Sequence, residues 1–338
     1  MDLNTIWFFL IGVLIIGYAV LDGFDLGVGS LFFLLARQED EKTVLIKSIG
    51  PFWDGNEVWL LTGGGAIFAA FPLVYATVFS GFYLAMMLVL FALILRAVSI
   101  EFRTLAEDPG WRGRFDLLFF LGSFLPALLF GVAVGNIARG LPLDAAHHYT
   151  GGFLGLLNPY ALLLGLLGLA AFLMQGITYT LLKTEGAVQE RARSLFPKLW
   201  AALLAVLAAA SLASWLTVPA LFANYTARPV LYVFPLLTIA AAAVLPLTVR
   251  ASRYGYSFLA SSLVMAGMIA TLGMGMYPNL VPAVNPALSL SIYNASSSPL
   301  TLKTMLIIAL LGMPIVLFYT VFVYRVFRGK VDSGPAGY

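Results

Sequence analysis

Long stretches of apolar residues alternate with short polar segments along the whole chain of 338 residues. A helix needs roughly 20 apolar residues to cross the hydrocarbon core of a membrane. Nine stretches meet that length, and they cover residues about 6–36, 51–72, 77–96, 115–138, 152–182, 199–221, 229–249, 256–277 and 301–324. The pattern therefore predicts an all-α polytopic membrane protein whose nine transmembrane helices form a single transmembrane domain, residues 1–338.

The composition of the chain agrees with this pattern. Hydrophobic residues make up 61% of the sequence and charged residues 10%, whereas a soluble domain carries about 25% charged residues. So few charges cannot solvate the surface of a water-soluble protein of this size. The first apolar stretch has no basic segment before it and is longer than the apolar part of a signal peptide, so we expect it to be a retained helix.

Basic residues are distributed very unevenly between the two sides of the predicted membrane. Placing the nine spans in alternating directions puts 16 of the 19 Lys and Arg residues on one side. The other side receives only Arg139, Arg228 and Lys303. Because Lys and Arg concentrate in cytoplasmic loops, we expect the N-terminus outside and the C-terminus in the cytoplasm.

Two aspartates interrupt the first predicted span. Asp22 and Asp25 are three residues apart, so they share one face of a helix, and the nearby Gly23 and Gly27 allow another backbone to approach closely. A charge inside a span costs at least about 2.5–3.5 kcal/mol on insertion scales and usually has a partner. Two interpretations stay open: a structural lock, such as a pair with Arg96 of the third span, or a carboxylate that binds ions or conducts protons.

The second predicted span begins with polar residues. Its segment WDGNEVW places Asp54, Asn56 and Glu57 between Trp53 and Trp59, at the cytoplasmic mouth of the span. Both carboxylates share a face in the first turns of the helix, where negative charge complements the helix dipole. Helix capping is therefore one interpretation, with the tryptophans as interfacial residues. An entry point for cytoplasmic protons is the other.

Residues that bind metals or redox cofactors are scarce. The chain has no cysteine, which excludes disulfides and thiolate ligands. Its two histidines, His147 and His148, are adjacent in the loop after the fourth span, so no histidine is available inside the bundle to ligate a haem. We predict no cofactor-binding or metal-binding residue in the spans, and an external metal site at the two histidines is a minor alternative.

Three segments together resemble one family of respiratory proteins. They are LDGFDLGVG (21–29), PFWDGNEVWLLTGGGAIFAAFP (51–72) and FSGFYLAMMLVLFALILRAVSIEFR (79–103). With the nine-span layout, they are similar to subunit II of the cytochrome bd quinol oxidase family of bacteria and archaea. The local similarity covers about the first hundred residues, and the remainder agrees mainly in span number, topology and short loops.

The resemblance implies a fold and a function. It implies a haem-free subunit in the cytoplasmic membrane, built from two four-helix bundles plus one peripheral helix and paired with subunit I. In that family, subunit I carries two b-type haems and one d-type haem. The complex reduces oxygen to water with quinol electrons and cytoplasmic protons, which builds a proton motive force. Small single-helix subunits often join it, and some members hold a structural quinone in subunit II.

The same resemblance assigns roles to the carboxylates. Asp54 matches a family aspartate proposed at a cytoplasmic proton path, and Asp25 matches a membrane acid of the same motifs. Glu57, one turn after Asp54, is expected to be a second stop on that path. Asp22 is the fourth candidate, because it shares a helix face with Asp25.

Other matched residues are expected to support this site. Trp59 matches a tryptophan near a lateral oxygen entrance, and Trp53 and Asn56 are expected to pack around the site. Arg96 is expected to end the third span and to neutralise at least one of the acids that converge there, Asp25 or Asp54.

The main alternative is a proton-coupled secondary transporter. Such proteins also use acids in spans and proline-broken helices, but they carry similarly interrupted segments in two halves of the chain, and we find no such pair. A purely structural membrane scaffold is a third interpretation. An oxidase subunit co-purifies with a haem-bearing partner, whereas a transporter is colourless and functions alone.

Overall fold

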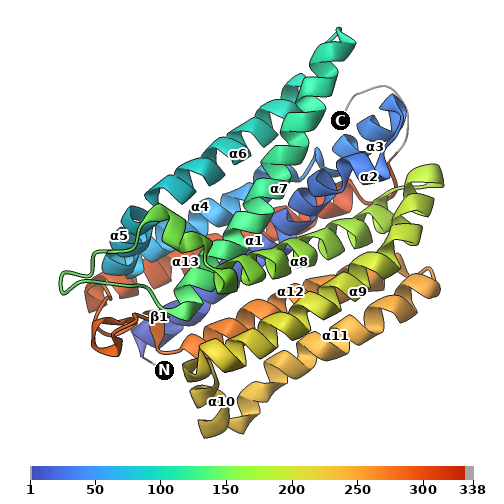
Figure 1. Ribbon diagram of the computed structural model, residues 1–338. Coiled ribbons are helices and arrows are strands. Elements are labelled where there is room, and N and C mark those ends of the chain that lie inside the picture. The colour runs from blue at the N-terminus through green and yellow to red at the C-terminus, as the bar shows by residue number, and fades with distance from the viewer. Residues whose placement is uncertain (1, 332–338) are drawn as a thin grey trace.

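A computed structural model describes residues 2–331 as a bundle of long helices that run roughly parallel or antiparallel to one another (Figure 1). The first part of the chain forms α1 Leu3–Ser30, α2 Phe32–Leu35, α3 Glu39–Ile49, α4 Trp53–Ala70, α5 Pro72–Gly81, α6 Tyr83–Phe102 and α7 Pro109–Arg139. The second part forms η1 Phe153–Leu157, α8 Pro159–Lys183, α9 Gly186–Thr217, η2 Pro219–Phe222, α10 Ala223–Ala227, η3 Pro229–Tyr232, α11 Val233–Arg250, α12 Tyr254–Met276, β1 Asn279–Val281, η4 Pro286–Leu288, β2 Leu290–Ser291 and α13 Pro299–Val326.

Eight helices of the described chain are long and apolar enough to cross a membrane. They are α1, α6, α7, α8, α9, η3 joined to α11, α12 and α13. This confirms the prediction of an all-α polytopic membrane protein. The helix α4 covers the predicted second span but is not one of the eight, because Asp54, Asn56 and Glu57 occupy its first turns and glycines follow.

The helix α1 lies at the centre of the bundle and contacts α4, α7, α8 and α12. At one end, Trp7 Nε1 donates a hydrogen bond to the carbonyl oxygen of Leu302 (2.9 Å), so α1 and α13 begin together. At the opposite end, Lys183 Nζ donates to the carbonyl oxygen of Phe327 (2.6 Å), so α8 and α13 finish together. We call these the Trp7 end and the Lys183 end of the bundle.

Two glycines allow α1 and α8 to cross at backbone contact. A Cβ atom on Gly27 would lie 2.7 Å from Cα of Gly176, and a Cβ atom on Gly176 would lie 2.6 Å from Cα of Gly27. Real Cβ atoms do not approach other heavy atoms so closely, so only glycine fits at either position. The close backbone approach expected from the glycines of the first span is therefore present at Gly27.

The third predicted span, 77–96, differs from the helices that form. The helix α5 ends at Gly81, and α6 continues to Phe102. Glycine is needed at the break, because a Cβ atom on Gly81 would lie 2.7 Å from the Cβ atom of Tyr149. The sequence predicted that Arg96 ends the third span. Because α6 continues to Phe102, Arg96 lies inside the helix instead.

Two other predicted spans also change at their ends. The span 6–36 is divided at Leu31 into α1 and the short helix α2. The span 152–182 becomes a helix only from Pro159, where the side chain of Asn158 caps the first turn by accepting a hydrogen bond from Ala161 N–H (3.0 Å). An apolar run alone does not show where a helix begins, because capping side chains and prolines determine the first residue of the helix.

Glu41, in the first turn of α3, connects the segment before that helix to α9. Its carboxylate pairs with Arg191 of α9 and accepts hydrogen bonds from the backbone N–H groups of Arg37 (2.7 Å) and Gln38 (3.0 Å). These contacts, above all the one with Arg191, lower the pKa of Glu41 from 4.5 to about 2.

We expect Glu41→Gln to remove a pH-dependent part of the stability. Because the pKa is lower in the folded chain, the contribution is complete above about 4.5 and is lost as the pH falls toward about 2. Its size is on the order of 1 kcal/mol. Thermal unfolding of the detergent-solubilised protein should show a larger fall in Tm from pH 6 to pH 3 for the wild type than for Glu41→Gln. The exposed Glu190 of α9 provides a control, since Glu190→Gln should follow the wild type; identical pH profiles for all three would contradict this role.

Candidate functional site

Four charged side chains from three helices meet inside the bundle. Asp22 and Asp25 of α1 and Arg96 of α6 have no solvent exposure, and 23% of the side chain of Glu57 of α4 is exposed. We call these four residues the acid–arginine cluster. The helix α1 contacts α4 directly, and its Asp22 reaches α6 through the ion pair with Arg96.

Arg96 joins two of the three acids. Its Nη2 atom lies 2.7 Å from Oδ1 of Asp22 and 3.3 Å from Oε2 of Glu57. The expected neutralising role of Arg96 thus falls on Asp22 and Glu57, and the structure gives it no ion pair with Asp25 or Asp54. The sequence gives the depth of Arg96 along its helix. It does not give the rotation of the helix, so it does not tell which acid the side chain reaches.

The cluster contains more negative than positive groups. If Asp22, Asp25 and Glu57 were all ionised, Arg96 would balance one of three charges in a medium of low dielectric constant, and such excess charge is strongly disfavoured. Several buried atoms, namely Oδ2 of Asp22, Oδ1 of Asp25 and both Nε and Nη1 of Arg96, lack a hydrogen-bond partner among residues 2–331. A site with this composition can take up a proton on a carboxylate.

Asn56 positions the carboxylate of Asp25. Its Nδ2 atom donates hydrogen bonds to Oδ2 of Asp25 (2.8 Å) and to the carbonyl oxygen of Leu21 (3.1 Å). Its Oδ1 atom accepts a hydrogen bond from the hydroxyl of Tyr324 on α13 (3.0 Å). Asn56 therefore contacts the site directly, as its place in the second span suggested. The sequence analysis missed Tyr324, and the only signal was a hydroxyl among apolar residues near the end of the last span.

Asp54 lies apart from the cluster. Its side chain is exposed in the first turn of α4 at the Lys183 end, and it makes no hydrogen bond or ion pair with residues 2–331. Phe52 occupies the N-cap position of α4, and no side chain caps the helix there. Asp54 is thus a carboxylate open to water, one turn before Glu57, and it does not form a capping hydrogen bond.

The two tryptophans of the second span occupy different environments. Trp59 is buried, with 8% of its surface exposed, and its ring packs against Leu14 and Tyr18 of α1. Trp53 is half-buried and packs against the main hydrophobic core at the start of α4. Trp59 therefore lies in the contact between α4 and α1, whereas Trp53 lies near the start of α4.

Both histidines of the loop after α7 contact other residues at that end of the bundle. His147 Nδ1 lies 3.2 Å from the carbonyl oxygen of Leu288, and His148 Nδ1 lies 3.4 Å from Oδ2 of Asp144. Within residues 2–331, no three His, Cys, Asp or Glu side chains gather in a way that could hold a metal ion.

The sequence matches known proteins over almost its full length. Residues 3–327 match the family described as cytochrome bd terminal oxidase subunit II. The chain is 39% identical to the probable cytochrome oxidase subunit 2 of Haemophilus influenzae and 38% identical to the cytochrome bd-I ubiquinol oxidase subunit 2 of Escherichia coli K12. Each alignment covers 98% of this chain and 96% of the relative. The cytochrome bd ubiquinol oxidase subunit 2 of Bacillus subtilis is 36% identical over 98% of this chain and 97% of its own length.

A solved structure shares the fold. The bd oxidase of Geobacillus thermodenitrificans matches with a TM-score of 0.81, covering 97% of this chain and 99% of that chain at 17% sequence identity. These matches support the oxidase-subunit interpretation over the transporter alternative, because both the sequence relatives and the fold belong to bd oxidases. The chain is therefore a member of the cytochrome bd terminal oxidase subunit II family.

Proposed function

We propose that this chain is the haem-free membrane subunit of a bd-type quinol:oxygen oxidoreductase and that it contributes a path for cytoplasmic protons. Membership of the family supports the enzyme class. The observation that carries the proton path is the acid–arginine cluster, in which a fully buried arginine faces three carboxylates. The electron donor is a quinol, and the overall reaction converts oxygen to water.

The redox centres belong to subunit I in this proposal. Two b-type haems and one d-type haem would lie there, as the resemblance to the family implies. In this chain, His147 and His148 lie in a loop and contact Leu288 and Asp144. Subunit I is the partner in a heterodimer, and single-helix subunits, lipids and a structural quinone are further partners of the kind the family allows.

The membrane arrangement follows from the helices and the basic residues. With α4 counted beside the eight apolar helices, the chain crosses the membrane nine times as two four-helix bundles and a peripheral helix, α13. The Trp7 end faces outward and the Lys183 end faces the cytoplasm, because most Lys and Arg residues fall toward the Lys183 end. The protein then resides in the cytoplasmic membrane of a bacterium or archaeon.

The path begins at Asp54 and continues to Glu57. Reduction of oxygen to water consumes one proton for each electron, so protons must enter a region of low dielectric constant without a permanent charge. Asp54 is exposed and can exchange protons with cytoplasmic water, and Glu57 follows one turn later with part of its side chain still exposed. A proton on Glu57 neutralises its charge, and Arg96 keeps its shorter contact with Asp22 (2.7 Å).

Asp25 is the deepest carboxylate of the path. It is fully buried, Asn56 fixes one of its oxygens, and no basic side chain of residues 2–331 forms an ion pair with it. A protonated Asp25 reduces the excess negative charge of the cluster and can release the proton when a neighbouring acceptor becomes available. Asp22 keeps its ion pair with Arg96, which fixes the position of the arginine in the site. Buried Trp59 limits contact between this region and the lipid and is a candidate for the wall of an oxygen entrance.

Purification tests the enzyme class. We expect the affinity-tagged chain to bring down a haem-bearing partner from its own membranes, with redox-sensitive visible bands and oxygen consumption driven by quinol. A colourless preparation that transports a solute on its own would contradict the proposed function.

We expect Asp54→Asn to slow turnover of the assembled complex, because an amide of the same shape cannot carry a proton. Oxygen consumption should fall by about 100-fold or more, while haem content and reduction by quinol remain normal. Asp54→Glu should restore part of the activity. Asp40, an exposed acid of α3 that makes no hydrogen bond or ion pair with residues 2–331, supplies the control Asp40→Asn, which should not change turnover. Normal oxygen consumption by Asp54→Asn would remove Asp54 from the path.

A further inference from the structure

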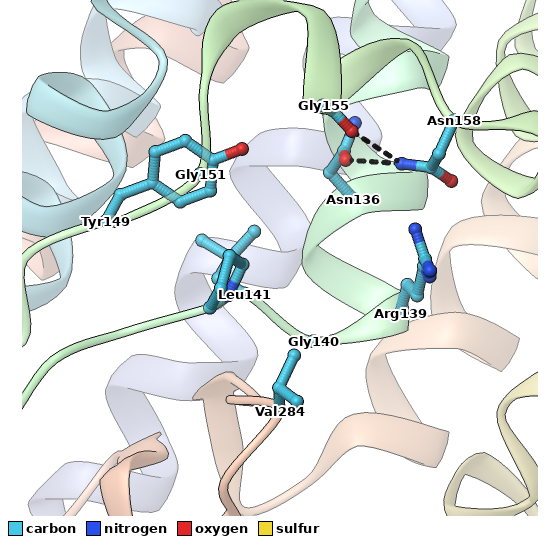
Figure 2. A pocket seen from close by; sticks show the side chains of 10 residues that line it. Asn136, Arg139, Gly140, Leu141, Tyr149, Gly151, Gly155, Asn158 and Val284 are labelled. Atoms are coloured by element: carbon cyan, nitrogen blue, oxygen red, sulfur yellow. Dashed lines mark hydrogen bonds between the residues drawn. The ribbon is translucent and has the colours of Figure 1, made fainter.

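A cavity of about 280 Å³ lies at the Trp7 end, away from the acid–arginine cluster. Its wall is formed by the last turn of α7, the loop that follows it, the segment that leads into α8, and Val284 (Figure 2). Gly140, Gly151 and Gly155 line it, so much of the wall is backbone without side chains. None of its lining residues is acidic.

The two asparagines in the wall hold it in shape. Asn158 Nδ2 donates hydrogen bonds to Oδ1 of Asn136 (2.9 Å) and to the carbonyl oxygen of Gly155 (3.2 Å), as Figure 2 shows. Asn136 Nδ2 donates to the carbonyl oxygens of Val132 (2.9 Å) and Leu156 (2.8 Å). Because these amide groups are already engaged with the protein, the asparagines build the cavity and leave its charge to another residue.

Arg139 gives the cavity its charge. The side chain is exposed, extends from the end of α7 toward Asn158 (Figure 2), and forms no hydrogen bond or ion pair with residues 2–331. A guanidinium group offers several N–H donors in a planar arrangement that suits a phosphate group. A cavity with this cation and no acid therefore favours an anion.

An apolar surface continues from the cavity along the next helix. Leu154 and Leu157 of η1 are 77% and 41% exposed, and Leu162 and Leu166 of α8 are 39% and 49% exposed. Asn158, Leu162 and Leu166 are spaced by four residues, so the two leucines lie on the α8 face that begins at the cavity. This continuity pairs an anion-binding group with a strip suited to hydrocarbon.

We propose that the cavity binds the headgroup of an anionic phospholipid, with its phosphate on Arg139 and an acyl chain along Leu154, Leu162 and Leu166. The positive charge and the adjacent apolar strip together match a molecule that is anionic at one end and apolar at the other. A free anion would use the cavity but gain nothing from the leucines. The site is independent of the proton path, because the cavity and the acid–arginine cluster share no residue.

The test uses the intact complex, delipidated in detergent and titrated with phosphatidylglycerol, with bound lipid counted by native mass spectrometry. Arg139→Gln should weaken the tightest phosphatidylglycerol binding about fivefold, the effect expected for one basic side chain at an anionic lipid surface. Arg139→Lys should retain most of the binding, because it keeps the charge. Arg228, an exposed arginine at the same end that does not line the cavity, supplies the control Arg228→Gln, which should bind as the wild type does.

Two further ligands separate a lipid from other anions. Phosphatidylcholine, whose phosphate is balanced by a cation, should bind more weakly than phosphatidylglycerol and should be insensitive to Arg139→Gln. Millimolar inorganic phosphate should not displace the lipid. The proposal is overturned if Arg139→Gln and Arg228→Gln bind phosphatidylglycerol equally, if phosphatidylcholine binds as tightly, or if inorganic phosphate displaces the lipid, which would make the cavity a site for free anions.

Discussion

Arg96 and Asp22 form an ion pair of 2.7 Å between α6 and α1, and neither side chain is exposed to solvent. Removing one partner of a buried pair leaves an uncompensated charge and costs about 3–5 kcal/mol, so the two helices are held at one depth relative to each other. The packing around the pair agrees with this constraint. Gly122 of α7 lies against the backbone of α6 at Arg96, where a Cβ atom would be 2.7 Å from Arg96 N, so α7 can cover the arginine only because this residue is glycine.

The same pair explains why the other acids are chemically distinct. Asp22 takes the shortest contact with the only cation of the cluster, Glu57 takes a longer one, and Asp25 is held by Asn56 instead. The three carboxylates therefore differ in how strongly a positive charge compensates them. This difference allows a proton to reside on one carboxylate and to move to another. Tyr324 connects this arrangement to α13, whose other end is fastened near Trp7, so the peripheral helix is attached at both ends of the bundle.

Much of this could be predicted from the sequence, because a membrane span requires length and apolarity, and a buried acid requires a partner. The apolar runs predicted the helical class, the acids of the first two spans predicted the place of the site, and Gly27 marked a close crossing. The sequence offered a pair between Arg96 and an acid of the first span, but it could not tell that Asp22 is the partner, because that depends on how neighbouring helices rotate. It also missed the continuation of α6 beyond Arg96, the contact of Tyr324 with Asn56, and the cavity at Arg139, since each depends on residues far apart in the chain.

The central claim is that the acid–arginine cluster holds a proton on Asp25 while Asp22 pairs with Arg96. Infrared difference spectroscopy of the intact complex measures this directly, because a protonated carboxylic acid has a carbonyl stretch that a carboxylate lacks. We predict a carboxylic-acid band that changes during turnover, disappears in Asp25→Asn and persists in the control Asp40→Asn. A spectrum in which Asp25→Asn leaves every carboxylic-acid band unchanged would show that Asp25 does not carry the proton and would contradict the account.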